Sequence, residues 1–247
     1  MVTMNSTRIY PNVRLGEGVI VQDWVVIGLP PNHTEPGELE TVIEAGSVIR
    51  SHTVIYAGAR IGPNFQTGHR AIIGPGVEIG AGCSVGTNSV VEGFVRLHDG
   101  AKVHSRCSIG MFSELREKAW VGPVCTLEGS PQRPVVVESG AMLGSTICVS
   151  AGVRVGENAL VAAGAYLQRD VPPCHLVAGS PGRSVKDVTR LSCPYELIDR
   201  PYEIEQDRRE IIEKRDRARL ESTQAADTWR HHLWERLGSP KRAFSQL

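Results

Sequence analysis

Residues 49–93 read IRSHTVIYAGARIGPNFQTGHRAIIGPGVEIGAGCSVGTNSVVEG, and the stretch repeats a simple pattern every six residues. Every sixth position from Ile43 to Leu127 is aliphatic, with the single exception of Thr67. A fixed period of this length is the signature of a parallel β-helix, in which each hexad supplies one short strand and one turn. Three hexads complete one triangular coil, and the aliphatic side chain fills its interior.

The period extends in both directions from this stretch. After a shift of four residues it resumes over residues 137–167, where all six positions are aliphatic. Upstream, Val13, Val19 and Val25 fall in phase with residue 43. We therefore expect the β-helix to begin near the N-terminus and to continue past residue 167.

Two further columns support the same reading. Glycine often follows the aliphatic residue, where we expect it to relieve a turn with positive φ. The fourth residue after the aliphatic is usually small and should also point inward. Cys83, Cys107 and Cys125 lie in this small column, so we interpret them as packed, unreactive thiols.

Composition limits the function classes. The 247 residues contain 27 Lys+Arg and 27 Asp+Glu, giving a net charge of zero. A balanced charge argues against nucleic acid or an anionic membrane as the main partner. No apolar run reaches membrane-spanning length and no signal-peptide pattern opens the sequence, so we expect a cytoplasmic location.

The last quarter of the chain has a different composition. Residues 186–247 carry 13 basic and 12 acidic residues but only one of the 26 glycines. We place the β-helix domain at residues 1–186 and a charged C-terminal extension at 187–247. Helical patterns over 201–221 and 225–237 predict that this extension is mostly helical and caps the coils or binds a partner.

The repeat resembles that of the hexapeptide-repeat acyltransferases. The resemblance covers residues 9–186, and the F-x-T-G-H motif that ends at His69 is similar to that of the sugar-nucleotide and amino-sugar N-acetyltransferase branch. The family implies a mainly β fold, a left-handed parallel β-helix, and a homotrimer with active sites between subunits. It also implies acetyl-CoA as co-substrate and no metal.

The resemblance also implies a reaction. An acetyl group would pass from acetyl-CoA to the amino group of a nucleotide-linked amino sugar, by direct attack with a histidine as general base. His69 suits this role because an imidazole titrates near neutral pH. His104 lies 35 residues further on and is expected to form a second wall of the same cleft.

Other residues are predicted to bind ligands. For the acceptor we select polar positions on or near the F-x-T-G-H coil: Gln66, Thr67, Arg70, Asn88 and Glu92. Thr67 is selected because a polar residue at an inward position breaks the local rule. For the coenzyme we select a small-residue run and an exit cation: Ala162, Ala163, Gly164 and Arg183. His52 and His98 are additional candidates.

Three alternatives remain open at this point. The enzyme would instead acylate a hydroxyl of a sugar or small alcohol, since Glu128–Gly129 replaces a Thr-Asn pair of the branch. A zinc enzyme of the γ-carbonic anhydrase type would need His69, His98 and His104 to converge. A non-catalytic scaffold would have no need of the polar break at Thr67.

Overall fold

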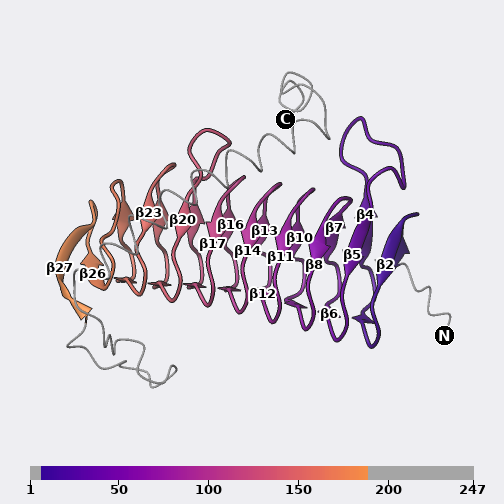
Figure 1. The fold of residues 1–247 in the computed structure, drawn as a ribbon, viewed down its shortest axis with the longest axis horizontal. Coiled ribbons are helices and arrows are strands. Elements are labelled where there is room, and N and C mark those ends of the chain that lie inside the picture. Colours follow the sequence, from indigo (N-terminus) through magenta and orange to yellow (C-terminus); the bar gives the residue numbers. More distant parts are fainter. Residues whose placement is uncertain (1–6, 189–247) are drawn as a thin grey trace. The chain divides into compact units, whose positions relative to one another are not determined.

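The computed structural model describes residues 7–188, which form three parallel β-sheets wound into one triangular solenoid (Figure 1). Most strands are two residues long, and strands three apart in the chain pair with each other. The three sheets are the faces of the prism. We call them sheets A, B and C and name each corner by the two sheets that it joins.

The strands alternate regularly among the three faces. Sheet A contains β1 (Arg8–Ile9), β4 (Val26–Leu29), β7 (Val54–Tyr56), β10 (Ile72–Ile73), β13 (Val90–Val91), β16 (Ser108–Ile109), β19 (Thr126–Leu127), β22 (Cys148–Val149) and β25 (Tyr166–Leu167). Sheet B contains β2 (Val13–Leu15), β5 (Thr41–Ile43), β8 (Arg60–Ile61), β11 (Glu78–Ile79), β14 (Arg96–Leu97), β17 (Glu114–Leu115), β20 (Val136–Val137) and β23 (Arg154–Val155). Sheet C contains β3 (Ile20–Val21), β6 (Val48–Ile49), β9 (Gln66–Thr67), β12 (Ser84–Val85), β15 (Lys102–Val103), β18 (Trp120–Val121), β21 (Met142–Leu143), β24 (Leu160–Val161), β26 (His175–Ala178) and β27 (Arg183–Asp187).

The predicted inward column forms the core. Its aliphatic members from Ile43 to Leu127 are at most 5% exposed, and those over 137–167 at most 1%. Consecutive coils are in register at intervals of 18 residues, as in the pairing of Ile73 with Ile55 on one side and Val91 on the other. The small column is buried as well, including Cys83, Cys107 and Cys125, so the interpretation of these thiols as packing residues is consistent with their burial.

The register predicted for the first coil was wrong. Val21 pairs with Ile49 and Ile27 with Ile55, so the inward aliphatic positions there are Leu15, Val21 and Ile27. Val13, Val19 and Val25 occupy the small column instead. The reason is an inserted loop over residues 30–40, whose ten extra residues are not a multiple of six.

The role predicted for the glycine column was also wrong. The glycine after each aliphatic residue does not adopt positive φ. At Gly86, for example, an added Cβ would lie 2.5 Å from backbone atoms of His104 and Ser105 in the next coil. Glycine is therefore required there for close stacking of coils, and the left-handed φ occurs two residues later in each turn.

Both interruptions of the period leave the solenoid at the same corner. Loop 30–40 connects β4 to β5, and loop 128–135 connects β19 to β20, so both lie at the A–B corner. Figure 1 shows them projecting from the same edge of the ribbon. At the other end of the solenoid, β27 pairs antiparallel with β26. The predicted helices of the extension lie outside the described residues.

Candidate active site

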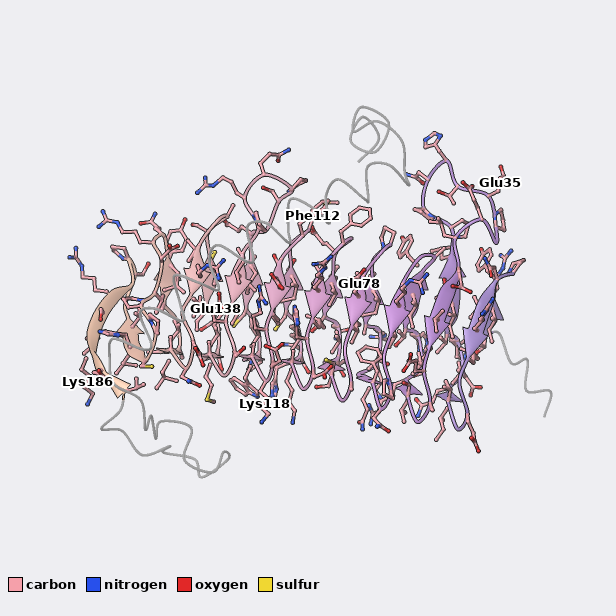
Figure 2. The ribbon with its side chains drawn as sticks, in the orientation of Figure 1. Glu35, Glu78, Phe112, Lys118, Glu138 and Lys186 are labelled. Atoms are coloured by element: carbon pink, nitrogen blue, oxygen red, sulfur yellow. The ribbon has the colours of Figure 1, made fainter. Side chains whose placement is uncertain are left out.

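The C–A corner gathers most of the predicted site residues in one row of turns. Each of these turns follows a strand of sheet C and leads into sheet A, on the edge behind the face shown in Figure 2. The row includes the predicted residues His69, Arg70, Asn88, His104, Ala162, Ala163 and Gly164, with Gln66 on the adjoining strand. The turn after β26 lies at the same corner, since the Gly182 N–H donates to Tyr166 O at 2.7 Å; Arg183 follows it.

His69 is exposed and is held from two sides. Its Nδ1 lies 2.8 Å from Ser51 Oγ in the preceding coil, and its backbone N–H donates to Thr87 Oγ1 in the following coil at 3.2 Å. Ser51 is itself anchored, because its N–H donates to Gln22 Oε1 at 3.1 Å. When Nδ1–H donates to Ser51, Nε2 carries the free lone pair of a general base. Sequence reasoning did not select Ser51, although it lies one 18-residue coil before His69.

Thr67 points into the prism and not into the groove. Its side chain is buried, and Oγ1 accepts the backbone N–H of Arg50 at 2.8 Å and lies 3.2 Å from Thr53 Oγ1. The Arg50 guanidinium also donates to the Thr67 carbonyl. The polar break therefore ties two coils together directly beneath His69, and its hydroxyl is not available to a ligand from outside.

His104 lies two coils further along the corner than His69. Its exposed ring packs edge-on against Trp120, with the centroids 4.7 Å apart. Partial burial, helped by the charge of Lys102, lowers the pKa of His104 below its ordinary value of 6.5. The imidazole is therefore neutral near pH 7.

The C–A corner differs from the other corners in its backbone. Left-handed φ values of 53–66° recur at the third residue of these turns, and here the position holds large side chains: Trp24, His52, Arg70, Asn88, Arg106, Val124 and Thr146. At the B–C corner glycine occupies the equivalent position at 18, 46, 82, 100 and 140. A non-glycine residue in this region costs roughly 1–2 kcal/mol, and such strain is concentrated at functional sites.

Two candidates lie at other corners. Glu92 follows β13 at the A–B corner, where its Oε2 accepts the Met111 N–H at 3.0 Å. His98 is at the B–C corner, with Nε2 2.7 Å from Glu114 Oε1. Within one chain, His98 is therefore separated from His69 and His104. Among residues 7–188 no three His, Cys, Asp or Glu side chains are grouped to hold a metal ion.

A shallow cavity of about 400 Å³ lies on sheet B. Its lining includes Arg60, Glu78, Arg96 and His98 but none of the residues predicted to be catalytic or to bind ligands. It is also far from the strained turns. We therefore place the candidate site at the C–A corner, where the polar and small residues meet along one edge.

The closing coils continue this edge. Ala162, Ala163 and Gly164 form the turn between β24 and β25, and Ala163 lies five coils beyond His69 in the same row. At about 4.8 Å per coil the two are roughly 24 Å apart. The small side chains leave the backbone open to a thin, extended ligand, while Arg183 is exposed at the end of the row.

Comparisons with known proteins agree with this architecture. A family model described as "Bacterial transferase hexapeptide (six repeats)" matches residues 58–93, and one described as "Hexapeptide repeat of succinyl-transferase" matches residues 134–169. Among residues 7–188, no helix has the length and apolar character needed to cross a membrane.

Relatives and solved structures extend the likeness. The bifunctional protein GlmU of Thermotoga maritima is 29% identical over 188 residues, which cover 60% of this chain and 42% of that protein. GlmU of Methylococcus capsulatus is 33% identical, covering 65% of this chain and 31% of that protein. The chain thus spans less than half the length of these relatives. LpxA, a UDP-N-acetylglucosamine acyltransferase from Bacteroides fragilis, shares the fold, with a TM-score of 0.50 and 16% identity over 87% of this chain and 90% of that one. The stacked parallel coils, the two hexapeptide matches and these relatives together show that the chain belongs to the hexapeptide-repeat acyltransferase family, whose fold is a left-handed parallel β-helix.

Proposed function

We propose that this protein is an acyl-CoA-dependent N-acyltransferase that moves an acetyl group from acetyl-CoA to the amino group of a nucleotide-linked amino sugar. The observation that carries the proposal is the exposed His69, which Ser51 orients at the C–A corner. A row of small residues leads along the same corner from His69 to Arg183. The matches to GlmU and LpxA support the same class of reaction.

The geometry suits direct transfer without a covalent enzyme intermediate. The acceptor amine attacks the thioester carbonyl carbon, and Nε2 of His69 takes the proton that the amine loses. The tetrahedral intermediate collapses with cleavage of the C–S bond, and the coenzyme leaves as its thiol after receiving a proton from His69. Transfers of this kind gain about 10²- to 10⁴-fold from a positioned base.

Backbone donors for the oxyanion are available beside His69. The N–H groups of Thr87 and Ser105, in the next two coils, donate to no protein acceptor within the described part of the chain. A pair of preorganised N–H groups stabilises the negative oxygen of a tetrahedral intermediate. The small residues 162–164 and Arg183 would accommodate the coenzyme arm and its phosphate.

We also propose a homotrimer, with the C–A corner facing a groove between subunits. The outward column of sheet A beside this corner is aliphatic over four coils, at Val26, Val54, Ile72 and Val90. Ile72 is 37% exposed in the single chain, so burial of this stripe against a second copy would stabilise the assembly.

The proposal is tested by binding and turnover on the full chain. Acetyl-CoA is titrated calorimetrically beside free CoA and ATP, and release of the coenzyme thiol is followed with nucleotide-linked amino sugars and with the matching hydroxyl sugars. We expect both CoA species to bind, ATP not to bind, and only amino acceptors to react. His69→Gln should lower kcat about 100-fold or more, whereas His33→Gln, in the exposed loop 30–40, should not. Absence of acetyl-CoA binding would refute the donor, and reaction of the hydroxyl sugars alone would establish O-acyl transfer.

A further inference from the structure

Charge is segregated on the surface although the chain as a whole is neutral. The ion pairs among residues 7–188 lie on sheet B, in the turns beside it, or where loop 30–40 meets it. They are Arg14–Glu40, Arg60–Glu40, Arg96–Glu78, His98–Glu114, His98–Glu117, Arg116–Glu114, Arg116–Glu138 and Arg154–Glu138. Figure 2 shows Glu78 and Glu138 along this face. The arginines of sheet B thus have carboxylate partners.

The C–A corner has cations without such partners. From β6 to β19, the strands of sheets C and A and the turns between them carry Arg50, His52, His69, Arg70, Lys102, His104 and Arg106, and no Asp or Glu. No carboxylate of the described residues lies within 4.0 Å of Arg70, Lys102 or Arg106. A row of like charges repels itself, so an anion at this corner would stabilise it.

Two of these cations occupy equivalent positions. Arg70 and Arg106 are the third residues of their turns, two coils apart and on either side of Asn88. All three are exposed and have φ values of 56–61°. At about 4.8 Å per coil the two arginine backbones are roughly 10 Å apart, a gap that two arginine side chains leaning together can close around one bound group.

The strained backbone is an independent sign that these side chains are used. Glycine would fit the same conformation without cost, as it does at Gly82 and Gly100 at the B–C corner. At Arg70 and Arg106 a long cationic side chain is kept in spite of that cost. Guanidinium groups bind phosphate oxygens through paired hydrogen bonds, and the Asn88 amide can donate between them.

We propose that Arg70, Asn88 and Arg106 form a diphosphate-binding site, which takes the diphosphate of a nucleotide-linked acceptor. This assignment of the acceptor rests on the proposed function. The coenzyme phosphates would bind elsewhere, because the small residues 162–164 lie three coils beyond Arg106 in the direction of Arg183. The site places the acceptor's diphosphate on the same edge as His69 and leaves the closing coils to the donor.

The test is calorimetric titration of the full-length chain with inorganic pyrophosphate, and with orthophosphate beside it. Wild-type protein should bind pyrophosphate at one site per chain and orthophosphate at least about tenfold more weakly, since two arginines act on one ligand. Arg70→Gln and Arg106→Gln should each weaken pyrophosphate binding about tenfold or more. Arg60→Gln on sheet B is the matched control and should leave it unchanged.

The outcomes separate this site from the proposed reaction. Equal affinity of wild type and Arg106→Gln, or equal binding of orthophosphate and pyrophosphate, would overturn the site. Loss of pyrophosphate binding on saturation with acetyl-CoA would assign the diphosphate to the coenzyme and overturn the acceptor. If acetyl-CoA does not bind while pyrophosphate binding depends on both arginines, the donor is refuted and the anion site stands.

Discussion

Ser51 Oγ and His69 Nδ1 lie 2.8 Å apart across two adjacent coils. The contact links equivalent residues of successive turns, so stacking of the coils itself sets the direction of the imidazole. Gln22 extends the chain of contacts by one more coil, through its Oε1 and the Ser51 N–H. We infer that Ser51 is a positioning residue, because its contact with the reaction passes through His69.

Ser51→Ala should lower kcat about tenfold with little change in KM, since the imidazole loses its orienting partner and not its chemistry. The pH–rate profile should shift as well, because the hydroxyl no longer stabilises one state of the ring. Ser145→Ala, in the same row of the C–A corner, is the control and should behave like wild type. An unchanged pH profile and kcat in Ser51→Ala would show that the contact does not act on His69.

Thr67→Val should destabilise the fold by about 1–3 kcal/mol, because the Arg50 N–H loses its acceptor in a buried position. The measurement is the midpoint of urea unfolding. Thr126→Val makes the same change at an exposed position of β19 and should be nearly neutral. A Thr67→Val variant as stable as wild type would mean that filling the aliphatic column compensates for the lost hydrogen bond.

Val124→Gly should stabilise the chain by about 0.5–1 kcal/mol. Val124 has φ 63° and a side chain that is 48% exposed, so glycine relieves strain and sacrifices little packing. Val124→Ala removes the same methyl groups but keeps a Cβ, and it should show no gain. Comparison of the two unfolding midpoints isolates the backbone contribution, and a Gly variant less stable than the Ala variant would contradict it.

His104 should make the fold less stable in mild acid. Its pKa is lowered in the folded state, first by burial and then by Lys102, so the unfolded chain takes up the proton more readily. Stability from this residue is complete above pH 6.5 and is lost as the pH falls through the lower, folded value. His104→Gln should therefore lose less stability between pH 7 and pH 5 than wild type does, as measured by urea unfolding. An equal or greater loss in the variant would contradict the shift.

The inward column could be predicted from the sequence because burial acts on every sixth residue in the same way. Prediction failed where a loop disturbed the count. Ten residues inserted over 30–40 moved Val13, Val19 and Val25 from the aliphatic column to the small one, and no local feature of those valines reveals the change. The four-residue shift before residue 137 was recognised because strong hexads lie on both sides of it.

The site was predictable to the extent that 18-residue arithmetic applies. It placed His69 and His104 along one corner, and the structure brings them there. Glu92 follows the strand of sheet A instead of preceding it, so it belongs to the next corner although it lies only four residues beyond Asn88. Ser51 was missed because its importance depends on a contact between side chains, which periodicity alone does not specify.

The C–A corner also limits how such an enzyme can change. Positions along it are set by whole coils, so the separation between His69 and Ala163 varies only in steps of one coil, about 4.8 Å. A point mutation cannot lengthen it, whereas duplication or loss of 18 residues does so while every other row keeps its neighbours. Substrates of different lengths are therefore most readily accommodated by gain or loss of complete coils.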